Sequence, residues 1–371
     1  MNKTAHITGS IARTLLALTF LFSGFVKAVD PVGTVYKIED YLTAFGGVFT
    51  SLLPLATVAA VLLILTEWTL GVMMLCNIRT QITAWLALAF YLVMTPLTLY
   101  IALTNPITDC GCFGDALVIS NWQTFFKNVF LLALVAVLLF TKRHIPQTFV
   151  WWAELSIVLI GTALAGGLML YTHYHLPIID FRPYKIGNNI SELMEIPEGA
   201  PADVYAITLI YEKDGVEQEF TLQDYPRGDS TWHFVDQQSK LIRKGYEPPI
   251  HDFVLVNYDG EDLTYDLLDM DKVVLAVMYD LSKADLTQLP KLAALAGTNN
   301  RQDVPFYILT SATDEQIWEF IDAHHDLFTD DDRTLFLNAD GIMLKTIVRA
   351  NPGVFVIQNG TIIDKYNIRN R

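Results

Sequence analysis

The chain has 371 residues and a formal net charge of −15, and its charged residues are distributed unevenly. Residues 1–176 contain seven Asp/Glu and eight Lys/Arg, which gives a net charge of +1. Residues 177–371 contain 33 Asp/Glu and 17 Lys/Arg, which gives a net charge of −16. The acidic second part is repelled by nucleic acid and by anionic lipid, which argues against a nucleic-acid partner. All three cysteines lie in the first part, so no disulfide can cross-link the second.

Five stretches of the first part are long and apolar enough to cross a bilayer, which takes roughly 20 residues. They cover residues 11–28, 52–75, 82–103, 125–140 and 149–171. The fourth is the shortest, and the amphipathic residues 121–126 are expected to extend its start. The sequence therefore predicts an integral, multi-pass membrane protein whose partner is the lipid membrane.

The basic residues of the short loops predict the orientation, because cytoplasmic loops carry an excess of Lys and Arg. Lys3, Arg13, Arg79, Lys142 and Arg143 all fall on one side of the predicted spans, and the alternate loops have little basic excess. We therefore expect a cytoplasmic N-terminus and an extracytoplasmic C-terminal part, in the inner membrane. The first span could instead be a cleaved signal peptide, which would leave four spans in the same orientation.

The loop between the third and fourth spans contains two cysteines in the pattern DCGCFGD, at residues 109–115. A glycine between two cysteines lets the backbone close a small ring, and strained, exposed disulfides are the more oxidising ones. Cys110 and Cys112 are therefore candidate catalytic residues of a redox pair in a loop that an incoming thiol can reach. A structural loop or a pair of free thiols is the alternative. A metal site is less favoured, because no His lies nearby in the sequence.

The charges beside this pair predict its resting state. Asp109 and Asp115 should raise the pKa of a neighbouring thiol, because a like charge disfavours the thiolate. We therefore expect the two cysteines to rest oxidised and to accept electrons. Cys76, at the cytoplasmic end of the second span, is expected to be a small, buried, apolar residue.

One carboxylate, Glu67, lies inside the second span, where an ionised side chain is costly unless it is paired. Glu67 is therefore the third candidate catalytic residue, and Arg13 and Lys127 are its candidate partners. The alternative is a protonated Glu67 that bonds to a neighbouring helix.

These motifs resemble known membrane-protein families. Residues 13–31 resemble the opening helix of the DoxX-like proteins, and residues 67–71, EWTLG, resemble the second-helix signature of that family. The DCGCFGD motif and residues 122–128 resemble the MauE branch, named for methylamine utilisation. The resemblance covers about residues 8–142 and implies a four-helix bundle. It also implies a part in maturing a disulfide-rich periplasmic dehydrogenase, and thus extracytoplasmic thiol chemistry.

The second part begins with a β-rich segment, in which Asp214-Gly215 predicts a hairpin turn between strands at 204–211 and 217–222. The rest is expected to be an α/β sandwich with a mixed central sheet. Its predicted strands are residues 253–257, 273–279, 306–310, 334–337, 354–357 and 361–366, and its predicted helices are residues 286–295, 314–324 and 342–349.

Residues 250–371 resemble the thioredoxin-like fold, and Pro352 lies where that family has a cis-proline. The active Cys-x-x-Cys of the family would follow the strand at 273–279, but this chain has Tyr279-Asp-Leu-Ser there and no cysteine. Because a thiolate is the nucleophile of thiol exchange, this domain is expected to bind a partner rather than to react.

The predicted fold is a membrane α-helical bundle with a DoxX/MauE-like four-helix core (1–145) and a fifth span (146–176). The β-rich segment (177–249) and a soluble thioredoxin-like domain (250–371) follow. The first functional hypothesis is a membrane thiol/disulfide oxidoreductase or its accessory. Cys110 and Cys112 would exchange with an extracytoplasmic protein client, and a quinone is the candidate electron acceptor. The second is a non-enzymatic assembly or docking factor whose tail binds an extracytoplasmic protein. The third is a small-molecule carrier that uses Glu67.

Overall fold

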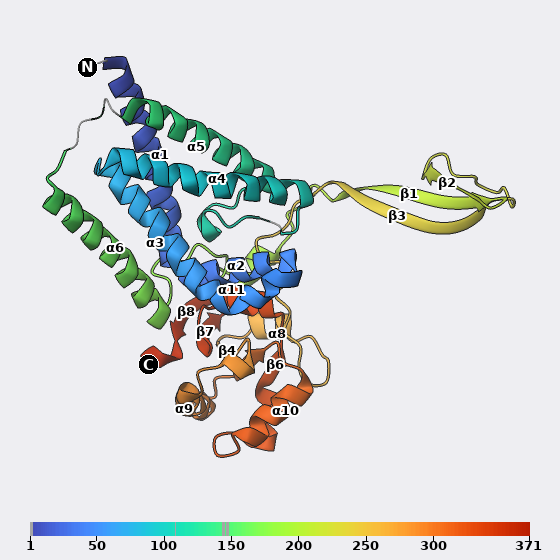
Figure 1. The fold of residues 1–371 in the computed structure, drawn as a ribbon. Helices are drawn as coiled ribbons and strands as arrows, with labels where there is room; N and C mark the ends of the chain where they lie inside the picture. The colour runs from blue at the N-terminus through green and yellow to red at the C-terminus, as the bar shows by residue number, and fades with distance from the viewer. Residues whose placement is uncertain (1–2, 108, 143–144, 146–147) are drawn as a thin grey trace.

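The computed structural model describes residues 3–107, 109–142, 145 and 148–371. It consists of a helical bundle, a sheet-containing C-terminal domain packed against one end of the bundle, and a projecting β-arm (Figure 1). Arg143, one of the basic residues that predict the orientation, lies outside the described residues.

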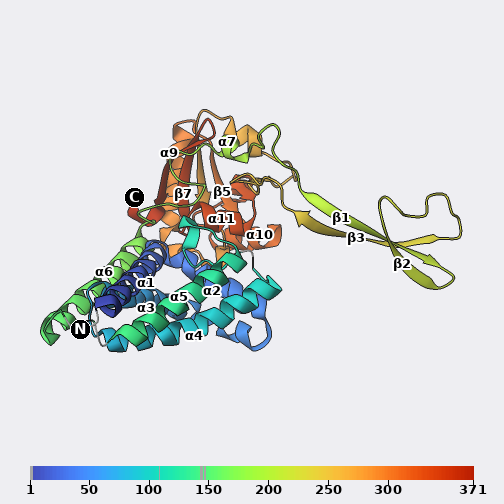
Figure 2. The same ribbon diagram turned by 90° about the horizontal axis from the view of Figure 1, so that it is seen from above.

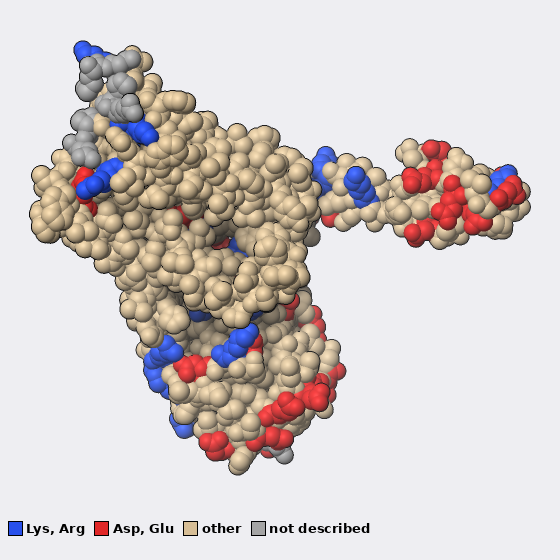
Figure 3. Space-filling model, in the orientation of Figure 1, with Lys and Arg blue, Asp and Glu red and all other residues tan. Residues whose placement is uncertain are grey.

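Five long helices are apolar enough to cross a membrane, as the sequence predicts. They are α1 (Lys3–Val29), α3 (Ala56–Leu75), α4 (Thr80–Thr104), α5 (Asn121–Thr141) and α6 (Trp151–Tyr174). α5 starts at Asn121, so the expected extension of the fourth span is confirmed. The bundle surface seen in Figure 3 is almost free of charged side chains, as lipid contact requires. The chain is therefore a multi-pass membrane protein.

A further helix, α2 (Pro31–Phe45), lies between α1 and α3 and was not predicted from the sequence. Asp30 caps its first turn by accepting a hydrogen bond from the backbone N–H of Gly33 at 2.9 Å. Val35, Ile38, Leu42 and Phe45 recur at helical spacing and could have revealed this helix, although Thr34 is the one residue of α2 classed as buried. Figures 1 and 2 place α2 at the end of the bundle that meets the C-terminal domain.

The backbones of α1 and α3 cross very closely. A Cβ atom on Gly24 would lie 2.8 Å from the backbone nitrogen of Trp68, and a Cβ atom on Gly71 would lie 2.8 Å from the backbone nitrogen of Leu21. Small residues permit such an approach between membrane helices. The close crossing positions the polar side chains of α1 and α3 described below.

The C-terminal domain is built on a five-stranded mixed sheet in the order β6-β5-β4-β7-β8. Its strands are β4 (Val273–Val277), β5 (Phe306–Thr310), β6 (Phe336–Asn338), β7 (Gly353–Gln358) and β8 (Thr361–Asn367). β4, β5 and β6 are parallel, whereas β7 is antiparallel to β4 and to β8. The predicted strand at 253–257 is wrong. Only Val256 pairs there, in single bridges to Asp262 and Asn338, because the neighbouring edge strand β6 is too short for a longer ladder.

Helices cover both faces of this sheet. α9 (Leu289–Arg301) and α10 (Asp314–Ala323) pack on one face, and α7 (Ile190–Met194), α8 (Thr264–Leu268) and α11 (Gly341–Ile347) pack on the other. The residues of β4 alternate between the two cores, as the pleat of a strand dictates. A separate sheet-containing C-terminal domain is thus confirmed. The Asn351–Pro352 peptide bond is cis, as predicted.

The β-arm is a three-stranded antiparallel sheet in the order β2-β1-β3. Its strands are β1 (Val204–Lys213), β2 (Val216–Thr221) and β3 (His233–Arg243). Asp214 and Gly215 have φ of +54° and +78° between β1 and β2, which confirms the predicted hairpin. β3 was not predicted, because every one of its residues is exposed and polar residues fill its centre. The arm projects away from both domains (Figures 1 and 2), and acidic side chains cover its outer half (Figure 3).

Adding one methyl group at the crossing of α1 and α3 should destabilise the bundle. Gly24→Ala and Gly71→Ala each place a Cβ atom 2.8 Å from a backbone nitrogen, so the helices must move apart, at a cost of about 1–3 kcal/mol. Thermal melting in detergent should show a lower midpoint for both variants. Gly166→Ala in α6 is the matched control, because no atom lies within 4 Å of its added Cβ. An equal loss in all three variants would contradict the close crossing.

Candidate functional site

The carboxylate of Glu67 is paired inside the bundle, and its partner is Lys27. Lys27 Nζ lies 2.9 and 2.7 Å from the two carboxylate oxygens, and both residues are 6% exposed. The hydroxyl of Ser23, one helical turn before Lys27, lies 2.7 Å from Lys27 Nζ and 2.9 Å from Glu67 Oε2. Hydrogen bonds of this kind offset the cost of removing two charges from water.

Both partners proposed for Glu67 from the sequence are wrong. Arg13 donates from Nη1 to the backbone carbonyl of Met74, and Lys127 Nζ lies 4.3 Å from the centre of the Phe113 ring. Lys27 was missed because it stands at the end of the predicted first span, where a lysine usually extends into the interface. The spacing of Ser23 and Lys27 could have revealed it, since residues i and i+4 share one helix face.

The same ion pair holds the cysteine loop in place. The backbone carbonyl of Cys112 lies 2.9 Å from Lys27 Nζ and 2.7 Å from the hydroxyl of Ser23. The loop turns back toward α1 at Gly111 and Gly114, whose φ angles of +62° and +51° suit glycine. The intramembrane charges and the cysteine loop therefore form one hydrogen-bonded unit.

The two thiols of this loop lie beside each other and differ in acidity. All three cysteines are free, and Cys110 Sγ lies 3.3 Å from the backbone nitrogen of Cys112 and 3.3 Å from Thr124 Oγ1. Hydrogen bonding between the two thiol groups lowers the pKa of Cys110 to about 6 against the opposing effect of burial, and the hydrogen bond with Thr124, the charge of Lys127 and the backbone N–H of Cys112 add to the lowering. The hydrogen bond to Cys110 and burial raise the pKa of Cys112.

This result corrects the expectation that neighbouring carboxylates raise the pKa of both thiols. Asp109 accepts hydrogen bonds from the backbone N–H of Gly111 at 2.8 Å and from Lys37 at 3.1 Å. Asp115 lies 3.4 Å from Arg349. A cation therefore offsets each carboxylate, and hydrogen bonds decide the acidity of Cys110. The expected disulfide stays a prediction.

The cysteine loop is less accessible than the sequence suggested, because α2 covers it. Cys110 is 7% exposed. The hydroxyl of Tyr41 donates to the backbone carbonyl of Cys110 at 2.8 Å. A Cβ atom on Gly111 would lie 2.7 Å from the side chain of Lys37, so that side chain lies directly on the loop.

Two cavities meet at the cysteine loop. The larger, of about 340 Å³, lies between the membrane helices, and both Cys110 and Cys112 line it. Most of its wall is apolar by area, but Ser23, Lys27, Glu67, Lys127 and Asn128 also line it. The smaller, of about 80 Å³, lies between α2, the loop and the C-terminal domain, and Cys110 lines it but Cys112 does not. Cys110 thus borders both cavities, whereas Cys112 borders only the larger.

The third cysteine, Cys76, is separate from this site. It follows the last residue of α3, nine residues after Glu67, or about 13 Å along the helix axis. It is half-buried, which corrects the expectation of a buried residue. Among the described residues, no group of three or more His, Cys, Asp or Glu could hold a metal ion.

Removing one partner of the Lys27–Glu67 pair should be far more harmful to stability than removing both. Glu67→Leu or Lys27→Met leaves one buried charge unpaired, at a cost of about 3–5 kcal/mol, whereas an apolar pair of similar volume is often neutral. We expect each single variant to insert into the membrane, to melt at a much lower temperature and to lose whatever redox or transport activity the wild-type protein has. The double variant should recover most of the thermal stability but not that activity. Additive losses in the double variant would show that the two residues do not act as a pair.

The acidity of Cys110 can be measured by titrating the ultraviolet absorbance of the thiolate in the reduced protein. The midpoint for Cys110 is expected near pH 6, rather than near its ordinary pKa of 9.0. Because the folded pKa is lowered, this group stabilises the reduced protein fully above its ordinary pKa, and the contribution is lost as the pH falls through about 6. Lys127→Met should move the midpoint upward, and Cys76→Ser should leave it unchanged. A midpoint above 8 for Cys110 would contradict this environment.

Comparison with known families gives two matches. Residues 205–244, which form most of the β-arm, match a family model described as a domain of unknown function (DUF8463). Residues 5–141 match the family model described as methylamine utilisation protein MauE. No curated protein and no solved structure is detectably similar to the chain. The second match spans α1 to α5, with the ion pair and the cysteine loop, so the membrane part of this chain is MauE-like.

Proposed function

We propose that this MauE-like membrane protein carries out thiol/disulfide exchange outside the cytoplasm, with Cys110 and Cys112 as its catalytic residues. The observation that carries the proposal is the placement of two free thiols next to each other in a loop that the Lys27–Glu67 pair holds against a cavity between the membrane helices. The lowered pKa of Cys110 beside the raised pKa of Cys112 supports it. Thiol exchange needs a thiolate as the attacking group, and a low pKa also makes Cys110 a good leaving group. The Lys27–Glu67 pair supports this chemistry by holding the loop rather than by reacting.

Cys110 is the sulfur that a client protein meets, because it borders the cavity next to α2. A client thiolate attacks Cys110 Sγ of the oxidised pair, the Cys110–Cys112 bond breaks, and Cys112 leaves as a thiolate and takes up a proton. The second thiolate of the client then attacks the client sulfur of the mixed disulfide, and Cys110 leaves as a thiolate. The client has become a disulfide, and two electrons have passed to the pair.

A membrane-soluble quinone is the proposed oxidant that restores the pair. The cavity of about 340 Å³ lies among the membrane helices, and its wall is mostly apolar by area with polar groups such as Lys27 and Lys127, which suits a molecule with an apolar body and polar carbonyl groups. The Cys110 thiolate bonds to Cys112, which loses its proton. The quinone takes up the two electrons, that proton and one more proton from water, and leaves as the quinol.

The proposed location of this chemistry is the outer side of the inner membrane, with the N-terminus in the cytoplasm. Arg79 and Lys142 supply the basic excess expected of cytoplasmic loops, and the cysteine loop lies at the opposite end of α4 and α5. The C-terminal domain packs at the cysteine-loop end, so it is proposed to be extracytoplasmic. Its strand order, with helices on both faces, supports a thioredoxin-like fold for this domain.

A non-enzymatic assembly or docking factor is the second candidate. The C-terminal domain contains no cysteine, and Tyr279 and Asp280 follow β4 where a redox domain of the proposed fold would have its first cysteine. Such a domain can hold a protein client but cannot exchange thiols with it. The carrier hypothesis gains no support, because the Glu67 carboxylate is bonded to Lys27 and Ser23.

Trapping experiments in cells separate these functions. We expect acid-quenched cells to contain Cys110 and Cys112 bonded to each other or to a client, so that only reductant exposes them to alkylation. Cys112→Ala should accumulate a mixed disulfide through Cys110, because the Cys110 thiolate attacks the disulfide of an oxidised client, the reverse of the last step, and no Cys112 is present to displace the client. Cys110→Ala should accumulate much less.

The control is Cys76→Ser, which should leave the redox state of the pair unchanged. A short-chain ubiquinone added to the reduced wild-type protein in membranes should restore the disulfide. Full labelling of both cysteines without reductant in quenched cells would reject the oxidoreductase and leave the docking factor.

A further inference from the structure

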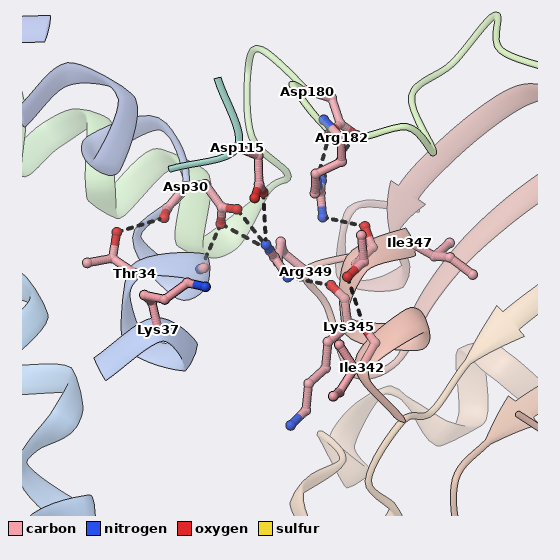
Figure 4. Close-up of polar contacts among 12 residues, drawn as sticks. Asp30, Thr34, Lys37, Asp115, Asp180, Arg182, Ile342, Lys345, Ile347 and Arg349 are labelled. Carbon is pink, nitrogen blue, oxygen red and sulfur yellow. Dashed lines mark hydrogen bonds and ion pairs between the residues drawn. The ribbon is translucent and has the colours of Figure 1, made fainter. Parts of the chain in front are cut away.

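One arginine joins the C-terminal domain to the corner between α1 and α2 (Figure 4). Arg349 Nε lies 2.9 and 3.2 Å from the two carboxylate oxygens of Asp30, and Nη2 lies 3.4 Å from Asp115. Nη1 donates to the backbone carbonyl of Lys345 at 2.6 Å, and the side chain is 8% exposed. The guanidinium therefore binds the residue that caps α2 and the end of the cysteine loop at the same time.

A pair of tyrosines forms a second contact between the same domain and α2. The hydroxyls of Tyr36 and Tyr279 lie 2.9 Å apart. Lys345 Nζ lies 4.9 Å from the centre of the Tyr36 ring and 6.0 Å from that of Tyr279. Tyr279 follows β4 by two residues, so this end of the sheet rests on α2.

α2 lies between the C-terminal domain and Cys110. Tyr36 meets the domain, whereas Lys37 and Tyr41, on the same helix, hold the cysteine loop. Thr34 is the one residue of α2 classed as buried, and Phe45, at the C-terminal end of α2, packs against Phe49 and Tyr100. The residues nearer Asp30 are partly buried, and elements with few buried apolar contacts are the ones that open locally. The position of this first part of α2 therefore depends on its polar contacts to the loop and to the domain.

We propose that α2 is a lid over Cys110, and that the C-terminal domain holds it shut through Arg349 until a client displaces the domain. The inference rests on the proposed function, because the lid controls access to the same two thiols. With the lid closed, both thiols reach the bundle cavity but no protein client reaches Cys110. The quinone is therefore reduced while the lid is closed, and the client is oxidised while the lid is open. The Cys110–Cys112 disulfide re-forms in the closed state, in which a second client cannot reach Cys110.

The rate at which N-ethylmaleimide labels Cys110 measures how often the lid is open. The full-length protein is reduced in membranes with Cys112→Ser and Cys76→Ser in every variant, so that Cys110 is the single thiol. Arg349→Ala should raise the labelling rate by roughly tenfold or more, because the rate follows the population of the open state. Asp30→Asn, which can still cap α2, should do the same. The double variant should match the single ones, because both act on one contact.

Arg333→Ala is the matched control. Arg333 is also a buried arginine of the C-terminal domain paired with an aspartate, Asp314, and its side chain is 6% exposed. It should leave the labelling rate unchanged. Unchanged labelling in Arg349→Ala and Asp30→Asn would overturn the lid, and so would an equal rise in Arg333→Ala. If the Arg349→Ala protein does not accumulate in membranes, Asp30→Asn and Tyr36→Phe provide the test instead. A faster labelling of Cys110 in these two variants supports the lid, and an unchanged rate overturns it. Labelling needs no turnover, so a lid that opens as expected over cysteines that never cycle would reject the proposed function alone.

Discussion

The Lys27–Glu67 ion pair is the interaction on which the rest of the membrane part depends. Two charges buried between membrane helices are tolerable only when they satisfy each other and find further hydrogen-bonding partners. Here those partners are the hydroxyl of Ser23 and the backbone carbonyl of Cys112. The pair therefore fixes the helix crossing and the cysteine loop together, and a change in one is transmitted to the other.

The environment of the thiols follows from that constraint. The backbone N–H of Cys112 and the Thr124 hydroxyl both lie 3.3 Å from Cys110 Sγ. The hydrogen bond between the two thiols lowers the pKa of Cys110 and raises that of Cys112, and the hydrogen bond with Thr124 and the charge of Lys127 add to the lowering at Cys110. The acidity comes from hydrogen bonds in a covered loop, and the acidic side chains next to it in the sequence are offset by Lys37 and Arg349.

The C-terminal domain has no cysteine of its own, yet it contacts the part of the bundle that covers the reactive loop. Its buried Arg349 reaches Asp30 and Asp115, and Tyr279 reaches Tyr36. A domain that cannot exchange thiols can still decide which thiols are reached. In the proposed mechanism, the domain without cysteines thus controls access to the two thiols of the bundle. The acidic β-arm projects away from this contact and contributes nothing to it (Figure 3).

The sequence by itself determined the features that depend on local pattern: five apolar spans, the alternating strands and helices of the C-terminal domain, and the Asp214-Gly215 turn. Hydropathy and turn chemistry act over short stretches of chain, so they can be read one residue after another. The partner of Glu67, the cover over Cys110 and the acidity of that thiol were decided by tertiary structure. Each depends on residues brought together by a helix crossing or by a domain contact. The sequence around a residue such as Lys27 does not indicate where its helix crosses another helix. The two carboxylates near the cysteines misled the sequence argument, because their charge matters only together with cations that the fold supplies.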